Sequence, residues 1–239
     1  MNVQDIVALI AVYLIIVAAL GLSLFVQKKG INWDNRKIIH IGVGAFIYVW
    51  WAFSANWIML VFFSVPFAIL LFFAMFPGNP VSDSKLGEVT NDMGHRYGLF
   101  LYVVTINIMV AFFFNDDCLG GEHWLAATLG IVAMTRGDGF GSIVGKRYGK
   151  HKIINGKSLE GTCAVFVATF VCSVIIIALY GFLASQGLFA GRTVDIIPGL
   201  AFAAVAGVLA AVVEAVCPGD IDNLLIPMTV LAAMILMGI

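Results

Sequence analysis

The strongest constraint on the fold of this chain is a series of long apolar stretches separated by short polar loops. Of its 239 residues, 62% are hydrophobic and only 11% are charged, whereas a soluble domain carries about a quarter charged residues. A helix needs roughly 20 apolar residues to cross a bilayer. Stretches that reach or approach that length cover residues 5–27, 38–54, 57–76, 98–115, 122–136, 161–183, 196–215 and 223–239.

These stretches predict an all-α fold, namely a polytopic transmembrane helix bundle with about eight spans (seven to nine). No intervening loop is long enough to hold a soluble domain, so residues 1–239 are expected to form a single integral membrane domain. The first apolar run is too long for the core of a signal peptide and is expected to stay as a membrane helix. The four cysteines form no CxxC pair and are expected to be buried apolar side chains.

The positions of the cations predict how the bundle sits in the bilayer. Of thirteen Lys and Arg residues, only Arg192 lies outside the loops that follow spans one, three and five. The positive-inside rule places those loops in the cytoplasm and both termini on the opposite side. The net charge of −1 gives no indication of a nucleic acid partner.

Every polar patch that suggests chemistry falls on this predicted cytoplasmic side. A transporter more often places its polar groups near the middle of the membrane. A cluster at one face instead favours an enzyme whose water-soluble substrate comes from the cytosol and whose second substrate lies in the lipid bilayer. A small membrane transporter is the weaker alternative.

The segment of about residues 136–161 is the predicted nucleotide-binding cytoplasmic loop. It combines glycines spaced four apart with the cations Lys146, Arg147, Lys150 and Lys157. Like charges crowded at one helix end repel one another, and a bound polyphosphate would relieve that repulsion. Two alternatives stay open, because such glycines form a packing face between membrane helices and such cations contact lipid headgroups. The segment is not a Walker A loop, since His151 stands where that pattern needs a glycine.

Carboxylates near the membrane boundary predict a Mg²⁺ site. A carboxylate close to hydrocarbon is costly and usually functional, and Mg²⁺ typically takes one or two carboxylates together with phosphate oxygens and water. Simple ion pairing of Asp138 and helix capping by the others are the alternatives. The candidate metal ligands are Asp138, Glu160, Glu214 and Asp222.

A further patch begins the second span. Arg36 and His40 are four residues apart and share a helix face, with Lys37 beside them. Such a face could hold phosphate oxygens, with His40 as a hydrogen-bond donor or proton acceptor. The alternative is a set of cations that only orient the span, next to a histidine that reaches the interface.

Four motifs, in order, resemble those of the CTP-dependent polyprenol kinases, which include dolichol kinase and phytol kinase. They are Arg36-Lys37-x-x-His40, the run from Gly137-Asp138 through Ser142, Gly145, Lys146, Arg147 and Lys150, then Gly156-Lys157-Ser158-x-Glu160-Gly161, and finally Glu214 followed by Asp222-Asn223-Leu224-x-Ile226-Pro227. The glycines of Gly139-Phe140-Gly141 depart from the family pattern, in which a small residue such as alanine is expected.

The resemblance implies an enzyme that transfers the γ-phosphoryl group of CTP to a polyisoprenoid alcohol with the help of Mg²⁺. It also implies that Ser142, Gly145, Ser158 and Gly161 belong to the nucleotide site together with the cations. A similar loop occurs in phosphatidate cytidylyltransferases, so a CDP-lipid synthase is the alternative. Those enzymes end in a different acidic motif, whereas this chain has Gly219-Asp220-Ile221-Asp222-Asn223.

The predicted mechanism assigns roles to the carboxylates and to His40. Asp138, with Asp222 or Glu214, is expected to hold Mg²⁺ on the nucleotide phosphates, and the cations to balance the remaining negative charge. Asp222, or alternatively His40, is expected to orient the lipid hydroxyl and accept its proton. The predicted catalytic residues are therefore Asp138, Asp222 and His40.

Overall fold

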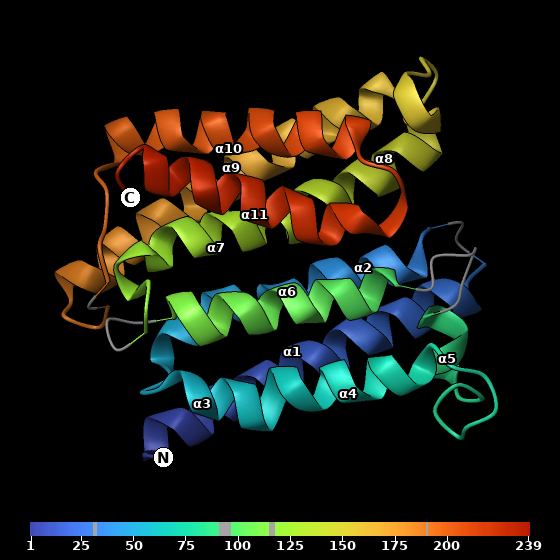
Figure 1. The fold of residues 1–239 in the computed structure, drawn as a ribbon, viewed down its shortest axis with the longest axis horizontal. Helices are drawn as coiled ribbons and strands as arrows, with labels where there is room; N and C mark the ends of the chain where they lie inside the picture. Colours follow the sequence, from blue (N-terminus) through green and yellow to red (C-terminus); the bar gives the residue numbers. More distant parts are fainter. Residues whose placement is uncertain (31–32, 91–96, 115–117, 190) are drawn as a thin grey trace.

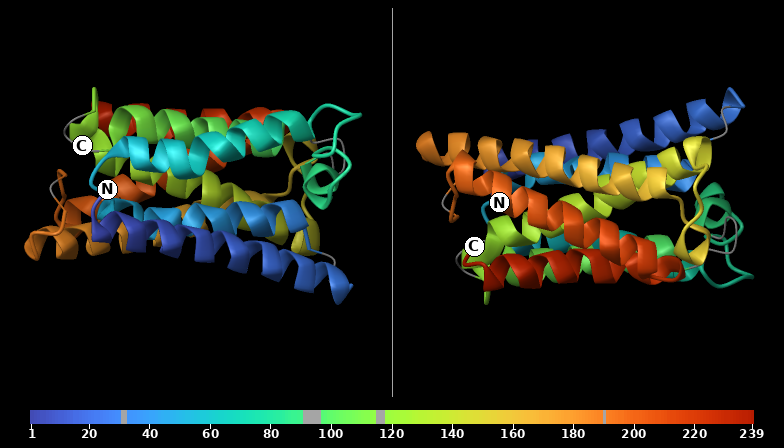
Figure 2. Two further views of the ribbon diagram at one scale, coloured as in Figure 1. Left: turned by 90° about the horizontal axis from the view of Figure 1, so that it is seen from below. Right: turned by 90° about the horizontal axis from the view of Figure 1, so that it is seen from above.

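The computed structural model describes residues 1–30, 33–90, 97–114, 118–189 and 191–239. Within these ranges the chain forms helices joined by turns and loops, and the β-type pairing is limited to one isolated bridge between Lys152 and Ser158. The helices run roughly parallel to one long axis, as the views in Figure 1 and Figure 2 show. The predicted all-α class is thus confirmed.

Five helical stretches are long and apolar enough to cross a membrane. They are α1 (Val3–Lys28), the continuous α3–η3–α4 (Asn56–Met59, Leu60–Ser64, Val65–Ala74), α9 (Leu159–Ser185), α10 (Ile196–Val216) and the stretch Gly219–Leu236, which joins η8 (Gly219–Ile221) to α11 (Asp222–Leu236). A shorter apolar helix, α6, covers Gly98–Phe113. These stretches support a membrane protein, while the number of spans stays a prediction.

The two other predicted spans, 38–54 and 122–136, coincide with helices that change pitch along their length. The first is α2 (Asn35–Val43) followed by the 3₁₀ turns η1 (Gly44–Tyr48) and η2 (Trp50–Ala52). The second is α7 (Trp124–Val132), the π-helical turn η6 (Ala133–Asp138) and α8 (Gly139–Tyr148). Hydropathy averages over a window of residues and does not report the hydrogen-bond pitch of a helix, so it detects neither the 3₁₀ turns nor the π-helical turn.

Three short elements complete the described chain. They are α5 (Lys85–Thr90), η5 (Gly121–His123) and η7 (Ile154–Gly156). Figure 1 shows α5 near the end of the bundle that also holds the start of α2 and the C-terminal end of α8.

The two chain termini lie together at one end of the bundle, remote from the polar patches. Figure 1 marks N and C at the end opposite to the start of α2, the end of α8 and the turn between α10 and α11. This arrangement matches the predicted separation of the termini from the polar patches, and the cytoplasmic position of the patches stays a prediction.

An aromatic cluster fills the core near the terminal end. The Trp50 indole donates a hydrogen bond to the Tyr180 hydroxyl, which donates in turn to the Ile47 carbonyl at 3.0 Å. Trp124 packs against Trp50 with ring centroids 5.7 Å apart. Because buried polar groups need partners, these bonds fix the 3₁₀ turns against α9. The polar side chains lie at the opposite end of the bundle.

Candidate functional site

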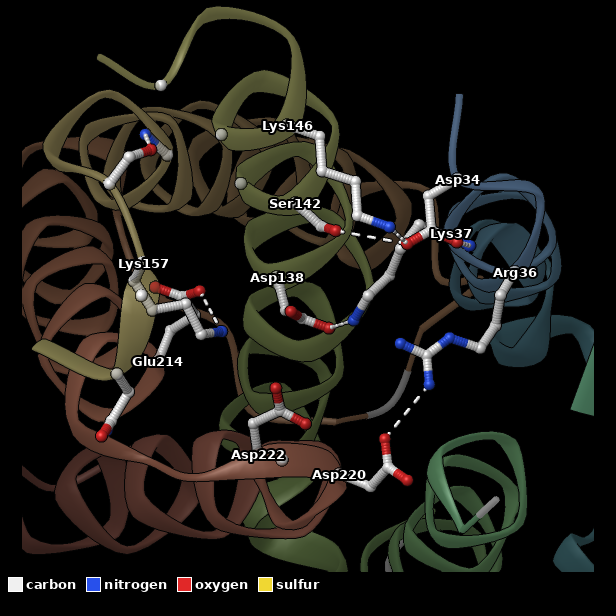
Figure 3. Close-up of a pocket in the computed structure, with 18 of the residues that line it drawn as sticks. Asp34, Arg36, Lys37, Asp138, Ser142, Lys146, Lys157, Glu214, Asp220 and Asp222 are labelled. Atoms are coloured by element: carbon white, nitrogen blue, oxygen red, sulfur yellow. Dashed lines mark hydrogen bonds and ion pairs between the residues drawn. The ribbon is translucent and has the colours of Figure 1, made fainter. Parts of the chain in front are cut away.

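A polar cavity of about 540 Å³ opens at the end of the bundle remote from the termini. Its walls come from the first turn of α2, from α8, from the loop before α9, from the end of α10 and from the start of α11. Figure 3 shows the charged side chains of these elements converging on one space. Segments up to about 180 residues apart in the sequence therefore form a single site, which we call the phosphate pocket, lined by Asp34, Arg36, Lys37, Asp138, Gly141, Ser142, Gly145, Lys146, Gly149, Lys152, Asn155, Gly156, Lys157, Ser158, Gly161, Glu214, Gly219, Asp220 and Asp222.

Asp138 occupies the floor of the phosphate pocket because the helix changes pitch there. It ends the π-helical turn η6, and its side chain is 2% exposed. Single π-turns inside α-helices are rare and occur often at functional sites. The extra residue in the turn rotates the following helix, so that Asp138 and Ser142, one turn later, both line the pocket.

The glycines of α8 allow a close approach to α9. A Cβ on Gly141 would lie 2.3 Å from a Val165 methyl group, and a Cβ on Gly145 would lie 3.2 Å from the Ser158 hydroxyl. The Ser158 hydroxyl also caps α9 by accepting from the Gly161 amide at 3.2 Å. The packing role of these glycines, which the sequence left as an alternative, is therefore present together with their position on the pocket wall.

Four ion pairs hold the pocket cations in place. Lys37 pairs with Asp138, and both side chains are almost fully buried. The other three pairs join Arg36 to Asp220 at 3.1 Å, Lys146 to Asp34 at 2.7 Å and Lys157 to Glu214 at 2.5 Å. Each cation thus has a fixed position before any ligand binds, and its acidic partner reduces the repulsion between neighbouring cations.

The electrostatics of two groups outside the membrane stretches show how strongly these charges interact. Burial raises the pKa of the Asp34 carboxyl, but the hydrogen bond and charge of Lys146 outweigh burial and hold that pKa below its usual value. Burial lowers the pKa of Lys157, but Glu214, Asp138 and Asp222 together raise it above its usual value. Three carboxylates therefore gather around one ammonium group.

Two carboxylates of the phosphate pocket, Asp138 and Asp222, are the candidates for holding a divalent cation. The Oδ1 atom of Asp222 is buried and has no hydrogen-bond partner among the described residues, which is costly for a carboxylate. No group of three or more metal-type side chains occurs in the described ranges. Asp138 and Asp222 thus fit Mg²⁺, which needs only one or two carboxylates when phosphate and water supply the other ligands.

His40 lies behind the pocket wall and does not line the pocket. Its Nε2 is 3.9 Å from Asp138 Oδ2 and has no hydrogen-bond partner among the described residues. Its ring packs against Tyr102 at a centroid distance of 3.9 Å, and the Tyr102 hydroxyl donates to the His40 carbonyl. His40 is therefore placed to act on Asp138, and the predicted direct contact with substrate is not supported by this geometry.

Three further residues predicted for the site, besides His40, lie outside the phosphate pocket. Glu160 accepts hydrogen bonds from the backbone amides of Lys150 and His151 and pairs with the His151 ring at 2.7 Å. It therefore stabilises the turn before α9, and a metal role would require it to leave these partners. The Arg147 guanidinium lies over the Tyr148 ring, 5.3 Å from the ring centroid. Neither Arg147 nor Lys150 lines the pocket.

The structure adds pocket residues that sequence reasoning did not select. Asp34 precedes α2, caps it through the Lys37 amide and pairs with Lys146. Lys152 and Asn155 line the pocket from the loop before α9, and Asp220 pairs with Arg36. The usable signal for Asp34 was a carboxylate directly before a cationic helix start, which capping alone explained equally well.

Comparison with known proteins identifies the family. The chain is 31% identical over 200 residues to the phytol kinase of Synechocystis sp., an alignment that covers 81% of this chain and 75% of that protein. The chain belongs to the polyprenol and phytol kinase family. Plant members of the phytol kinase group are also similar, with 28% identity over 215 residues to the probable chloroplastic enzyme of Triticum aestivum and 28% over 218 residues to that of Oryza sativa subsp. japonica.

The extent of these alignments is large in this chain and smaller in the plant proteins. They cover 85% of this chain in both cases, but 67% of the wheat protein and 64% of the rice protein. No family model matches the chain, and no solved structure matches it significantly.

Proposed function

We propose that this protein is a lipid-alcohol kinase that transfers the γ-phosphoryl group of CTP to the hydroxyl of a polyisoprenoid alcohol. The observation that carries the proposal is the phosphate pocket, in which four anchored cations surround buried Asp138 at one end of an apolar helix bundle. The similar proteins are named phytol kinases, so phytol is the first alcohol to test. The resemblance of the pocket loop to CTP-binding loops supports the choice of nucleotide.

The charges of the pocket suit a triphosphate. Phosphoryl transfer depends mainly on positioning and on neutralising the phosphate oxygens. Lys146 and Lys157 reach the pocket from opposite sides. Each ammonium group has three N–H donors, so it can contact a phosphate oxygen while it keeps its carboxylate partner. Bound Mg²⁺, held by Asp138 and Asp222, would supply further neutralisation of the phosphate charge.

The proposed reaction is balanced without any further reactant. The alcohol oxygen forms a bond to the γ-phosphorus, and the bond from that phosphorus to the oxygen bridging to the β-phosphate breaks. CDP leaves with that oxygen, and the hydroxyl proton passes to Oδ1 of Asp222, which has no other partner among the described residues, while Asp138 and the second carboxylate oxygen of Asp222 remain available to Mg²⁺. Lys37 pairs with Asp138 and holds it in position. His40 Nε2 lies 3.9 Å from Asp138 Oδ2 behind the wall, so His40 would act through Asp138 and not on the substrate.

Labelled nucleotide provides the test of this proposal. Purified protein in lipid is incubated with CTP labelled at the γ or the α phosphate, together with phytol, geranylgeraniol or dolichol. We expect γ label in the lipid product and α label only in CDP. An Asp138→Asn variant is expected to lose about 10²-fold or more in rate while remaining folded.

Two outcomes would contradict the proposal. Transfer of α label to the lipid would indicate cytidylyl transfer and a CDP-lipid synthase. Transfer of the γ label at equal efficiency from ATP, GTP, UTP and CTP would refute the assignment of CTP as the donor. The cytoplasmic position of the pocket is tested separately, by the reactivity of a cysteine introduced at Lys152 toward a membrane-impermeant thiol reagent in oriented vesicles.

A further inference from the structure

A second cavity, of about 320 Å³, lies between α1, α2, α4 and α6. Figure 1 shows these four helices grouped in one half of the bundle. The walls are almost entirely apolar, and they include Ile16, Ile39, Phe67, Leu71, Val103 and Ile106. We call it the apolar cavity. No residue of the phosphate pocket lines it, so the proposed phosphoryl transfer leaves this space unexplained.

The apolar cavity has one polar end. The side chains of Ser23, Gln27, Asn35 and Lys85 line it there, while the opposite end has only apolar walls apart from Ser64. The Oδ1 atom of Asn35 is buried and has no hydrogen-bond partner among the described residues. Since a buried amide oxygen without a donor is unfavourable, this atom suits a ligand that brings a hydroxyl group.

The polar end lies beside the phosphate pocket. Asn35 stands between Asp34 and Arg36 in the first turn of α2, and both neighbours line the phosphate pocket. The first turn of α6 likewise lies between the two spaces. A Cβ on Gly98 would lie 2.6 Å from Arg36 Nη1, while the next residue, Leu99, lines the apolar cavity. The two spaces are therefore separated only by the starts of α2 and α6.

The apolar cavity also opens sideways. Leu20 and Leu24 line it and are nevertheless 38% and 47% exposed on the outer face of α1. Farther along α1, the Tyr13 hydroxyl donates to the Phe62 carbonyl and joins α1 to η3. The opening thus lies between α1 and α4 on the pocket side of that contact, where an apolar chain could pass from the cavity into the lipid.

From these observations we infer that the apolar cavity binds the hydroxyl-proximal part of the alcohol's chain, with the hydroxyl end directed past Asn35 toward the phosphate pocket and the remaining chain leaving between α1 and α4. This inference rests on the proposed function and specifies its acceptor. With roughly 30 Å³ for a group the size of a water molecule or a methylene, the cavity holds on the order of ten carbons. The cavity therefore contacts about the first two isoprene units of the alcohol and places no upper limit on its chain length.

Photo-crosslinking tests this inference without requiring activity. A geranylgeraniol analogue with a diazirine in its second isoprene unit is irradiated with the wild-type protein in lipid. We expect labelled peptides from α4 and α6 around Phe67 and Val103, and competition by unlabelled geranylgeraniol. Label confined to the outer faces of α9 and α10 would overturn the inference, even if the protein phosphorylates alcohols normally.

A matched pair of variants tests the same point by activity. Val103 lines the apolar cavity, whereas Val104 lies on the neighbouring face of α6, outside that cavity. We expect Val103→Phe to lower kcat/KM for geranylgeraniol about tenfold or more, with unchanged affinity for CTP and unchanged turnover of dimethylallyl alcohol. Val104→Phe is expected to match the wild type on all three measures.

The outcomes separate the two proposals. Equal kinetics of the two variants would overturn the cavity assignment while leaving the kinase assignment intact. A wild-type protein that phosphorylates no alcohol would refute the proposed function, and the cross-linking result would then report on lipid binding alone. Since the cross-linking uses wild-type protein, the decision does not depend on whether the larger side chain at position 103 permits folding.

Discussion

The buried pair between Lys37 and Asp138 gives the sharpest prediction about how the phosphate pocket is built. Both side chains are at most 5% exposed, so each charge depends on the other for compensation. Removing either partner leaves an uncompensated charge in a low-dielectric environment, whereas removing both leaves none. The double variant is therefore expected to be more stable than either single variant.

The size of the effect follows from the geometry. Two unit charges 4 Å apart at an effective dielectric constant of 20 attract each other by about 4 kcal/mol. We expect Lys37→Met and Asp138→Asn each to lower the free energy of unfolding by about 3–5 kcal/mol. The double variant Lys37→Met with Asp138→Asn is expected to remain within about 1 kcal/mol of the wild type, because replacing a whole buried pair is often neutral.

The measurement is a double-mutant cycle in mixed micelles, with unfolding followed by circular dichroism as the denaturing detergent is increased. Glu122→Gln serves as a control, because it removes an exposed ion pair with His123 and should change stability by less than about 1 kcal/mol. Phosphorylation activity is measured on every folded variant. We expect the double variant to regain stability but not activity, since the carboxylate at position 138 is still missing.

Two results would refute this reasoning. Single variants that cost less than about 1 kcal/mol would show that water reaches the pair and screens it. Additive losses in the double variant would show that the two side chains stabilise the fold independently. In either case the charges of the pocket would not form the coupled network that the structure describes.

Three further predictions concern packing, metal dependence and pH. Gly141→Ala should destabilise the protein by about 1–3 kcal/mol, because the new Cβ meets a methyl group of α9. The control Gly181→Ala should not destabilise it, because a Cβ there meets nothing within 4 Å. Equal thermal stabilities of the two variants would contradict this prediction. Glu160→Gln should leave the Mg²⁺ concentration for half-maximal activity unchanged. An increase of that concentration by about tenfold would instead support the predicted role of Glu160 as a metal ligand. The pKa of Asp34 is lowered, since the hydrogen bond and charge of Lys146 outweigh burial. The stability that the ionised Asp34 contributes is therefore present above about pH 4 and is lost as the pH falls through the lowered pKa. Asp34→Asn should thus be less stable than the wild type at pH 7 and equally stable well below pH 3, and a stability difference that persists in acid would contradict the assignment.

The sequence allowed the chemistry of the site to be predicted better than its boundaries. Asp138 was selected because a carboxylate near hydrocarbon is costly unless it serves a purpose. Arg36 and Lys37 were selected as a cationic patch at the start of the second span, and Lys157 as a cation of the predicted nucleotide-binding loop. All four line the phosphate pocket. Arg147 was selected with its neighbours as part of a basic run. Successive residues on a helix point about 100° apart, so a run of cations cannot all face one pocket.

The apolar composition made the helical class predictable, but the same composition gives no information about irregular turns within the helices. Apolar composition indicates membrane helices but is insensitive to the π-helical turn at Ala133–Asp138 and to the 3₁₀ turns after α2. It is equally insensitive to the apolar cavity, because a leucine that faces lipid and one that faces a cavity give the same hydropathy. Only the packing of α1, α2, α4 and α6 distinguishes them.

Binding of Mg²⁺ and a non-hydrolysable CTP analogue, measured by calorimetry, tests the central claim most directly. The claim predicts one site per chain, with affinity reduced about tenfold or more by Lys157→Met, which removes a cation from the pocket. Arg147→Met, which removes a cation stacked on Tyr148 outside the pocket, should bind as the wild type does. Equal affinities for all three proteins, or a loss caused by Arg147→Met alone, would contradict the claim that this pocket holds the nucleotide.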